Sequence, residues 1–443
     1  MTATATVATP SPVPGKRGRR LLHPDPVVRR LAGLTLVNAF GNGLFMTTGV
    51  LFFTRALHFG AAGVGLGLTL AGLCGVLASI PAGRAADRWG TRPVLMTLVT
   101  VEAVGMAGYV AVHRYAAFVV LACAVTALDR GSAAVRNALY AQVLPKDVRV
   151  KGRAYLRAVT NVAIGAGAAV GSLALQADTH GAYAVAILAD AASFAAVALI
   201  LPTIPISAPA PVAVPAPVPA AGAAPTGPGG TTPAAPPRSA LRDRPFLAVT
   251  VINSLLCMQF AVIEIGIPLW LVQSTHAPRV LVAPLLITNT VLVVLFQVRA
   301  TRGTEELRSA ARAFRRGGLF VAAFCVTAAL AHGLPAVAAS LVLLAAAVLQ
   351  SVGEVLSQAG GWSLSYELAR EDAMGAYQGV FNAGQAAATM LGPVLVTVTA
   401  LEHGLAGWLL LAALFAASGL AMGPAVRRAQ RHRPVPVAVA VAE

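Results

Sequence analysis

Charged residues are scarce in this chain, and acidic residues are the scarcest. Only 17 of its 443 residues are Asp or Glu, and charged residues of both signs make up 11% of the total. A soluble domain carries roughly 25% charged residues, because its surface must face water. Hydrophobic residues make up 57% of the chain. This composition argues against a soluble protein and predicts an all-α integral membrane protein, since a bilayer tolerates apolar surface.

Cysteine and catalytic motifs are also sparse. The four cysteines are far apart and show neither CxxC nor Cys/His ligand spacing, which argues against a disulfide framework and against a metal site. No HExxH, GxSxG or P-loop string is present, so the sequence offers no hydrolase signature and no ATP site. We expect a protein that is not an enzyme and has no bound cofactor. A membrane-embedded enzyme or scaffold is the least favoured interpretation.

Long apolar runs predict twelve membrane-spanning helices, because a helix needs about 20 mostly apolar residues to cross a bilayer. Six runs contain no charge and lie at 31–54, 59–83, 158–177, 280–298, 373–401 and 404–426. Three contain a single acid and lie at 93–112, 181–201 and 245–275. Three are shorter or run into a charge, and these lie at 115–128, 317–331 and 334–353.

A proline-rich segment divides the runs into two groups of six. The segment 202–240 contains many prolines, and each proline removes a backbone donor and disfavours a helix. We predict a linker here, between six-helix bundles at 31–201 and 241–426. The remaining residues, 1–30 and 427–443, are predicted to be terminal tails.

Positive charge lies mainly on one side of the predicted spans. Of the 33 Lys and Arg residues, 29 fall in the tails, the linker and the loops on that side, and 3 fall in loops on the other side. Cytoplasmic loops carry such an excess, so both termini and the linker are expected in the cytoplasm, with the chain in the cell membrane. This distribution accounts for the net charge of +16 without a nucleic-acid partner. The expected partners are the lipid bilayer and a small-molecule substrate, and the chain is expected to be a monomer.

The loop after the second predicted span reads Gly-Arg-Ala-Ala-Asp-Arg-Trp-Gly-Thr-Arg-Pro over residues 83–93. It resembles the G-x-x-x-D-R-x-G-x-R signature loop of the major facilitator superfamily, in which the loop also joins spans two and three. The resemblance covers roughly residues 30–425 and implies two six-helix bundles with pseudo-twofold symmetry that transport by alternating access. It also implies a conformational latch made of Gly83, Asp87, Arg88, Gly90 and Arg92.

Two features depart from the family's pattern. The loop after the eighth span, at 297–303, keeps basic residues and a glycine but has no aspartate, so a second latch is expected to be degraded or absent. Span five contains Gly167 and Gly171 at GxxxG spacing, which lets helices approach closely. Ser172 stands where the family's exporters often have a proline, so this exporter motif is incomplete.

Two acids inside predicted spans are the leading site candidates. A charge near the bilayer centre costs about 2.5–3.5 kcal/mol on insertion scales, so it needs a function or a partner. Glu264 is predicted to couple protons or bind substrate, and the alternative is a carboxyl neutralised by a structural hydrogen bond. Glu354 has the same predicted role and shares a helix face with Gln350 and Gln358 through i, i+4 spacing. Its Gly-Glu pair resembles a feature of drug-exporting members, and a gate or surface role is the alternative.

Other polar residues in the spans are candidates for a cavity or a gate. Residues predicted to line the cavity are Asn38, Asn42, Gln350, Gln378, Asn382 and Gln385, with plain interhelical hydrogen bonding as an equal alternative. Asp129, Arg130 and Arg136 are predicted to form charge pairs at an inner gate. The resemblance places the spans of Glu102 and Asp190 outside the cavity, so structural pairing is the role expected for these two acids.

The function expected from these features is proton-coupled export of hydrophobic or cationic small molecules, driven by a proton gradient. Uptake of a metabolite by a carrier or facilitator is the alternative, because the exporter motif is incomplete and no proton-relay arginine is evident. The substrate is not predicted, since contacts in a cavity depend on how each helix is rotated about its axis.

Overall fold

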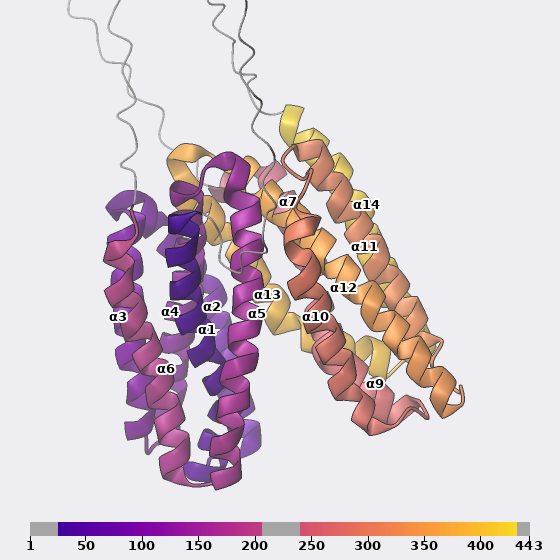
Figure 1. Ribbon diagram of the computed structural model, residues 1–443, viewed down its shortest axis with the longest axis horizontal. Coiled ribbons are helices and arrows are strands. Elements are labelled where there is room, and N and C mark those ends of the chain that lie inside the picture. The colour runs from indigo at the N-terminus through magenta and orange to yellow at the C-terminus, as the bar shows by residue number, and fades with distance from the viewer. Residues whose placement is uncertain (1–24, 206–239, 432–443) are drawn as a thin grey trace, which may run out of the picture.

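The computed structural model describes residues 25–205 and 240–431, and every regular element within these two ranges is a helix. The helices form two bundles, one from each range, that stand side by side (Figure 1). Most of the predicted linker and of the predicted tails lies outside the described residues. The prediction of an all-α architecture is confirmed.

The first bundle contains six long helices, which correspond to the first six predicted spans. Asp25 is the N-cap of the first helix, and its carboxylate accepts hydrogen bonds from the backbone N–H groups of Val27 and Val28. Pro26 occupies the first helical position, which proline favours. The helices are α1 Pro26–Leu51 with a π-helical turn at Phe52–Ala56, α2 Ala61–Trp89, α3 Thr91–Gly108, α4 Tyr115–Val143, α5 Lys146–Ala177 and α6 His180–Ile200.

The second bundle also contains six helical crossings, and its first is the most broken. That crossing consists of α7 Arg244–Cys257, the short α8 Gln259–Ala261, a π-helical turn at Val262–Gly266 and α9 Ile267–Ser274. The other helices are α10 Val282–Ala300, α11 Leu307–Ala329, α12 Ala336–Glu367, α13 Met374–Val396 with a π-helical turn at Thr397–Leu401, and α14 Gly404–Arg431.

Eleven helical segments in the described ranges are long and apolar enough to cross a membrane, and α11 is the helix that falls short of this measure. Four of its first ten residues are arginines, and the helix has 23 residues in all. At 1.5 Å per residue it is about 35 Å long, and it packs along α12 and α14. Its length and packing are those of a twelfth crossing, so the structure is consistent with the predicted count.

Helices α4 and α5 extend well beyond the apolar runs that predicted them. α4 continues through Asp129 and Arg130 to Val143, for 29 residues in all. α5 has 32 residues and begins at Lys146, whereas the predicted run begins at residue 158. Three arginines assigned to a loop by the sequence therefore lie inside α5. An apolar run marks the part of a helix in contact with lipid, and it misses a polar end that packs against protein.

The two bundles meet at one end of the molecule and separate toward the other (Figure 1). We call the end at which α1 and α7 begin the linker end, and the opposite end the far end. Across the interface, α2 packs against α13 and α5 packs against α10. A Cβ atom on Gly83 of α2 would lie 2.1 Å from the carbonyl oxygen of Gly375 in α13. Only glycine allows the backbones to approach this closely, so these two residues set the spacing of the bundles at the linker end.

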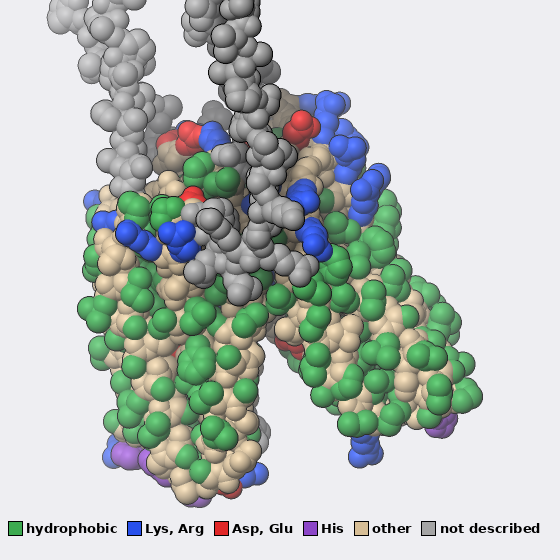
Figure 2. Space-filling model, viewed as in Figure 1, with side chains coloured by type: hydrophobic (Ala, Val, Ile, Leu, Met, Phe, Trp, Pro, Cys, Tyr) green, Lys and Arg blue, Asp and Glu red, His purple; other side chains and the backbone are tan. Residues whose placement is uncertain are grey.

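Side-chain chemistry divides along the same axis. Figure 2 shows hydrophobic side chains over the flanks of both bundles and most of the visible Lys and Arg side chains around the linker end, with a cleft between the bundles that widens toward the far end. This arrangement agrees with a bilayer around the flanks and with basic residues at one membrane surface. In this conformation the molecule is closed at the linker end and open at the far end.

Gly83→Val is expected to weaken closure of the linker end, because the new Cβ would collide with the Gly375 backbone. Lys146 and Glu371 report closure, since their charged groups lie 2.5 Å apart across the bundle interface. Cysteines placed at these two positions, in a chain whose own cysteines are replaced by serine, are expected to show a several-fold lower yield with a short thiol cross-linker when Gly83 is valine.

Gly65→Val is the matched control, because Gly65 lies on the same helix and a Cβ there meets no atom within 4 Å. An unchanged yield in the Gly83 variant, or an equal loss in the Gly65 variant, would contradict the close approach as the cause.

Candidate functional site

Asp87, in the last turn of α2, makes the contact that joins the two bundles most directly. Its Oδ1 accepts a hydrogen bond from the backbone N–H of Gly375 at 2.6 Å, and its Oδ2 accepts one from Ala376 at 2.7 Å. Both N–H groups belong to the first turn of α13, where no preceding carbonyl of the helix can accept them. The helix dipole also favours a negative charge at this position. The Asp87 carboxylate therefore caps a helix of the other bundle.

Three of the other predicted latch residues, Arg88, Gly90 and Arg92, act within the first bundle. The Arg88 guanidinium lies 5.7 Å from the ring centroid of Trp89. Gly90 has φ of +91° and separates α2 from α3, a backbone conformation that favours glycine. Arg92 donates to the carbonyl of Ile204. Among the predicted latch residues, the structure brings Gly83 and Asp87 to the second bundle, and the latch role itself remains a prediction.

The corresponding position of the second bundle has no such carboxylate contact among the described residues, as the sequence predicts. Gln297, at the end of α10, is fully buried, and neither side-chain polar atom has a hydrogen-bond partner in the described part of the chain. Contact with α5 comes instead from Glu305 in the loop after α10, whose Oε1 lies 2.7 Å from Lys151 Nζ. Both side chains of this ion pair are about half exposed, so it contributes little on its own.

Two arginines of α5 close the linker end against an aromatic pair on α12. Arg153 donates from Nη1 to the Tyr366 hydroxyl at 2.9 Å, and its guanidinium lies 4.9 Å from the Trp362 ring centroid and 5.4 Å from that of Tyr366. Arg149 lies 5.4 Å from the same Tyr366 ring. Each arginine is only 8% exposed, so its attraction to the rings is weakly screened by water.

Sequence reasoning missed this arginine–aromatic cluster, although one signal for it was present. Arg149, Arg153 and Arg157 are spaced four residues apart, which places them on one face of a helix. Their assignment to a loop concealed that periodicity.

A predicted cavity residue also joins the bundles. Asn137 of α4 donates a hydrogen bond to Asn382 of α13 at 3.1 Å.

The predicted inner gate lies within the first bundle. Arg136 donates from Nη1 to Asn38 Oδ1 at 2.6 Å, and Asp129 pairs at 3.6 Å with its neighbour Arg130. None of the side-chain hydrogen bonds or ion pairs of these three residues reaches the second bundle in the described part of the chain. At the linker end, arginine–aromatic contacts between the bundles come from α5 and α12.

Glu354 lies in a cage of amide side chains. It is 3% exposed, and its carboxylate accepts hydrogen bonds from Asn289 Nδ2 at 3.0 Å, Gln350 Nε2 at 3.2 Å and Gln358 Nε2 at 3.1 Å. Asn289 comes from α10 and was not predicted from the sequence. Amide donors satisfy the carboxylate oxygens without neutralising a charge, since no ion pair to Glu354 occurs among the described residues. The i, i+4 face predicted for α12 is confirmed.

Glu264 faces the space between the bundles. It lies in the π-helical turn Val262–Gly266 of the seventh crossing, just before Pro268 in the first turn of α9, and its side chain is exposed. It interacts electrostatically with Arg157 of α5 and with Glu354 of α12. Proline cannot donate to the preceding turn, and π-helical turns often occur at functional sites.

Arg157 of α5 interacts electrostatically with Glu264 from the opposite bundle. It is half-buried, and its Nε has no hydrogen-bond partner among the described residues. No direct ion pair joins it to Glu264, so the two opposite charges act on each other from separate bundles.

The predicted cavity residues divide into two groups. Asn38, Gln350, Gln378 and Asn382 are at most 8% exposed, and each forms a hydrogen bond to protein, as in the bond from Gln378 Nε2 to the Ser365 carbonyl at 3.1 Å. Asn42 and Gln385 are only half-buried. In this conformation the first group fits interhelical hydrogen bonding, and the second group is open to contact with a ligand.

Glu102 and Asp190 are fully buried inside the first bundle. Ser132 Oγ donates to Glu102 Oε2 at 3.2 Å, and Ser193 Oγ lies 3.3 Å from Asp190 Oδ1. The second oxygen of each carboxyl has no partner among the described residues. The two acids therefore pair with serine hydroxyls rather than with basic side chains, and they lie away from the cleft.

Tyr366→Leu is expected to lower the yield of the same linker-end cross-link, because it removes two arginine–ring contacts, each worth about 1–2 kcal/mol when shielded from water. Tyr366→Phe is the matched control, since it keeps the ring and removes only the hydroxyl. The phenylalanine variant is expected to retain most of the yield. Equal losses in the two variants would assign the contact to the hydroxyl and contradict a closure based on the rings.

The sequence model of the Major Facilitator Superfamily matches residues 31–393, which is most of the chain. A search of curated proteins found no match. Among solved structures, the human organic anion transporter MFSD10 is similar at 16% identity with a TM-score of 0.65, covering 90% of this chain and 100% of that chain.

Two further structures show the same fold. A bacterial homologue of the iron transporter ferroportin, in an outward-facing state with soaked iron, has 13% identity and a TM-score of 0.68, covering 92% of this chain and 100% of that chain. The E. coli fucose:proton symporter has 15% identity and a TM-score of 0.66, covering 91% and 98%. These identities show a shared fold, and the match over residues 31–393 shows the family. This chain belongs to the major facilitator superfamily.

Proposed function

We propose that this protein exports hydrophobic or cationic small molecules in exchange for protons. The observation that carries the proposal is the placement of Glu264, which is exposed in the cleft between the bundles and acts electrostatically on Arg157 of the opposite bundle. A carboxylate there can accept either a proton or a cationic group, and the two would compete for it. Competition for one site is the simplest basis for exchanging a substrate for a proton.

Charge balance supports a cation rather than an anion as the exchanged species. Glu264 interacts electrostatically with a second acid, Glu354, and with one base, Arg157. A cationic group in the cleft would be attracted to the Glu264 carboxylate, and an anionic group would be repelled by it.

The observed conformation corresponds to one of the two open states that a transport cycle by alternating access requires. By the distribution of basic residues, the linker end would face the cytoplasm, so the open cleft would face outward. A proton from outside would then reach Glu264 and displace a cationic substrate. Opening toward the cytoplasm would require the Asp87 cap and the arginine–aromatic contacts to separate, while the far ends of the bundles come together.

Uptake of a metabolite is the second candidate, and the fifth crossing favours it. α5 runs without a break from Lys146 to Ala177, and Ser172 occupies the place of the exporters' proline. A symporter and an exporter differ in the direction in which substrate moves when protons flow inward. The direction of substrate movement therefore distinguishes export from uptake.

The first test uses everted membrane vesicles and a permeant organic cation, tetraphenylphosphonium, as the probe. Addition of the probe to energised vesicles that contain the protein is expected to release protons, measured by a pH-sensitive dye. Glu264→Gln is expected to abolish this signal, because the amide cannot exchange a proton. The matched control is Glu402→Gln, which removes an exposed acid beside a far-end loop and is expected to leave the signal unchanged.

Proton release by Glu264→Gln at the wild-type level would contradict the role of Glu264. Movement of the probe out of the vesicle lumen together with protons, which corresponds to uptake by the cell, would contradict export and support uptake. A melting-temperature screen of purified protein against neutral, anionic and cationic compounds complements this test, since a bound ligand raises the melting temperature. Stabilisation by anions alone would contradict the cation preference.

Arg157→Gln is expected to shift the pH dependence of transport to higher pH. The positive charge favours the ionised form of a nearby carboxyl, so its removal lets Glu264 hold its proton at higher pH. Arg157→Lys keeps the charge and is expected to leave the pH dependence closer to that of the wild type. A shift to lower pH in the glutamine variant would contradict an interaction between these two groups.

A further inference from the structure

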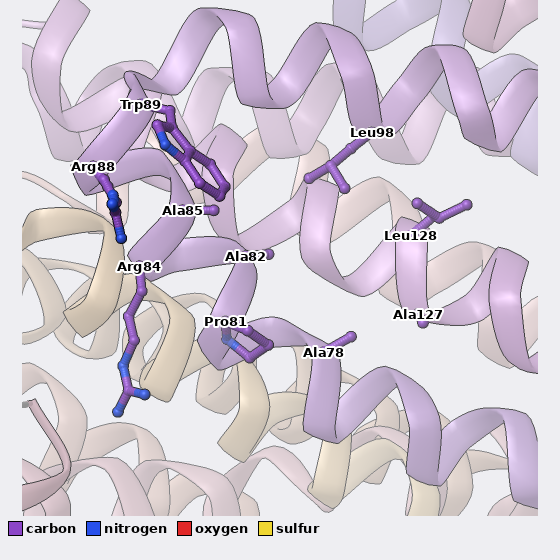
Figure 3. A pocket seen from close by; sticks show the side chains of 10 residues that line it. All are labelled: Ala78, Pro81, Ala82, Arg84, Ala85, Arg88, Trp89, Leu98, Ala127 and Leu128. Atoms are coloured by element: carbon purple, nitrogen blue, oxygen red, sulfur yellow. The ribbon is translucent and has the colours of Figure 1, made fainter.

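A hollow of about 530 Å³ lies on the flank of the first bundle, on the opposite side of α2 from the bundle interface. It lies between α2, α3 and α4 near the linker end, and Figure 3 shows its lining. Its size falls in the range of about 300–1,000 Å³ that small-molecule sites occupy. The apolar part of the lining consists of Ala78, Pro81, Ala82, Ala85, Leu98, Ala127 and Leu128, and the rest is Arg84, Arg88 and Trp89.

Small side chains create this hollow. α2 contributes three alanines and Pro81 to the wall. Its floor is therefore an apolar strip open to the surrounding bilayer. An apolar strip of this kind can hold a hydrocarbon chain, and the flank position limits access for a solute dissolved in water.

The rim of the hollow is basic and aromatic. Arg84 and Arg88 are both exposed and lie one turn apart on α2, which places their side chains on the same side of the helix. Trp89 beside them is 65% exposed, and tryptophan favours the interface between hydrocarbon and headgroups. Basic pockets between spanning helices near the cytoplasmic surface bind anionic lipid headgroups.

We propose that this hollow binds an anionic phospholipid, with its phosphate at Arg84 and Arg88 and one acyl chain along the floor. A second copy of this chain is a poorer occupant, because its own basic linker end would place like charges opposite these arginines. A zwitterionic lipid would fill the floor but would gain less from the two arginines.

The position of the hollow links the lipid to the closure of the linker end. At 3.6 residues per turn, the residues of α2 that line the hollow, such as Ala82 and Ala85, lie on one face of the helix. Gly83 and Asp87, which contact α13, lie on the opposite face. A lipid in the hollow therefore packs against the back of the helix that carries the cap.

The test measures lipid binding to the purified full-length protein by native mass spectrometry, with phosphatidylglycerol and phosphatidylcholine as probes. The wild type is expected to bind phosphatidylglycerol more tightly. The double variant Arg84→Gln/Arg88→Gln is expected to bind it about 30-fold more weakly, from the attraction of two basic residues to anionic lipid. Glycerol 3-phosphate, which has the phosphate but no acyl chain, is expected not to bind.

The matched control is Arg312→Gln/Arg316→Gln. These two arginines are also exposed and one turn apart, in the linker-end part of α11, but they do not line the hollow. Their replacement is expected to leave binding of phosphatidylglycerol within about two-fold of the wild type, because the headgroup contact at the hollow is intact. An equal loss in both double variants would overturn the proposal, since it would show a general surface attraction.

A second variant tests the floor separately. Ala85→Phe fills the hollow without changing charge and is expected to weaken binding of phosphatidylglycerol, while the circular dichroism spectrum stays that of the wild type. Wild-type binding by this variant, equal binding of the two phospholipids, or binding of glycerol 3-phosphate would each overturn the proposal.

Discussion

The hydrogen bonds from the first-turn N–H groups of α13 to the Asp87 carboxylate join the two bundles at the closed linker end. They satisfy two donors that the helix cannot satisfy by itself, and hydrogen bonds to a charged group are worth about 1.5–3 kcal/mol each. The same end requires Gly83 and Gly375 at the crossing of α2 and α13. Charge and close approach therefore act together, because the carboxylate reaches the helix only when the backbones touch.

The two sides of the interface are closed by different chemistry. Between α2 and α13 the contact is a carboxylate at a helix N-terminus. Between α5 and the second bundle it is a pair of arginines against the rings of Trp362 and Tyr366. The second kind of contact tolerates sliding better, since a ring face accepts a cation over a wider range of positions than a pair of N–H groups accepts two oxygens.

The acids within the membrane are accommodated in three ways. Glu354 receives three amide donors, Glu264 faces an arginine across a cleft, and Glu102 has only a serine hydroxyl among the described residues. The cost of burying a charge decreases with the number of donors and with access to water. Glu264 is exposed in this conformation, so among these three acids it is the one whose surroundings change most when the bundles move.

The sequence by itself determined the class of fold, the positions of the spans and the signature loop, because hydrophobicity and helix periodicity are local properties of the chain. It also predicted that Glu354 shares a face with Gln350 and Gln358, since an i, i+4 spacing needs no knowledge of neighbours. The tertiary structure alone decided that Asp87 caps α13, that Asn289 completes the cage of Glu354 and that Arg157 opposes Glu264. These partners are far apart in the chain, and their contacts depend on the rotation and approach of helices, which no local pattern encodes. The arginines of α5 fall between the two cases: their spacing was visible, but only the structure showed that a helix begins at Lys146 and carries them into the interface.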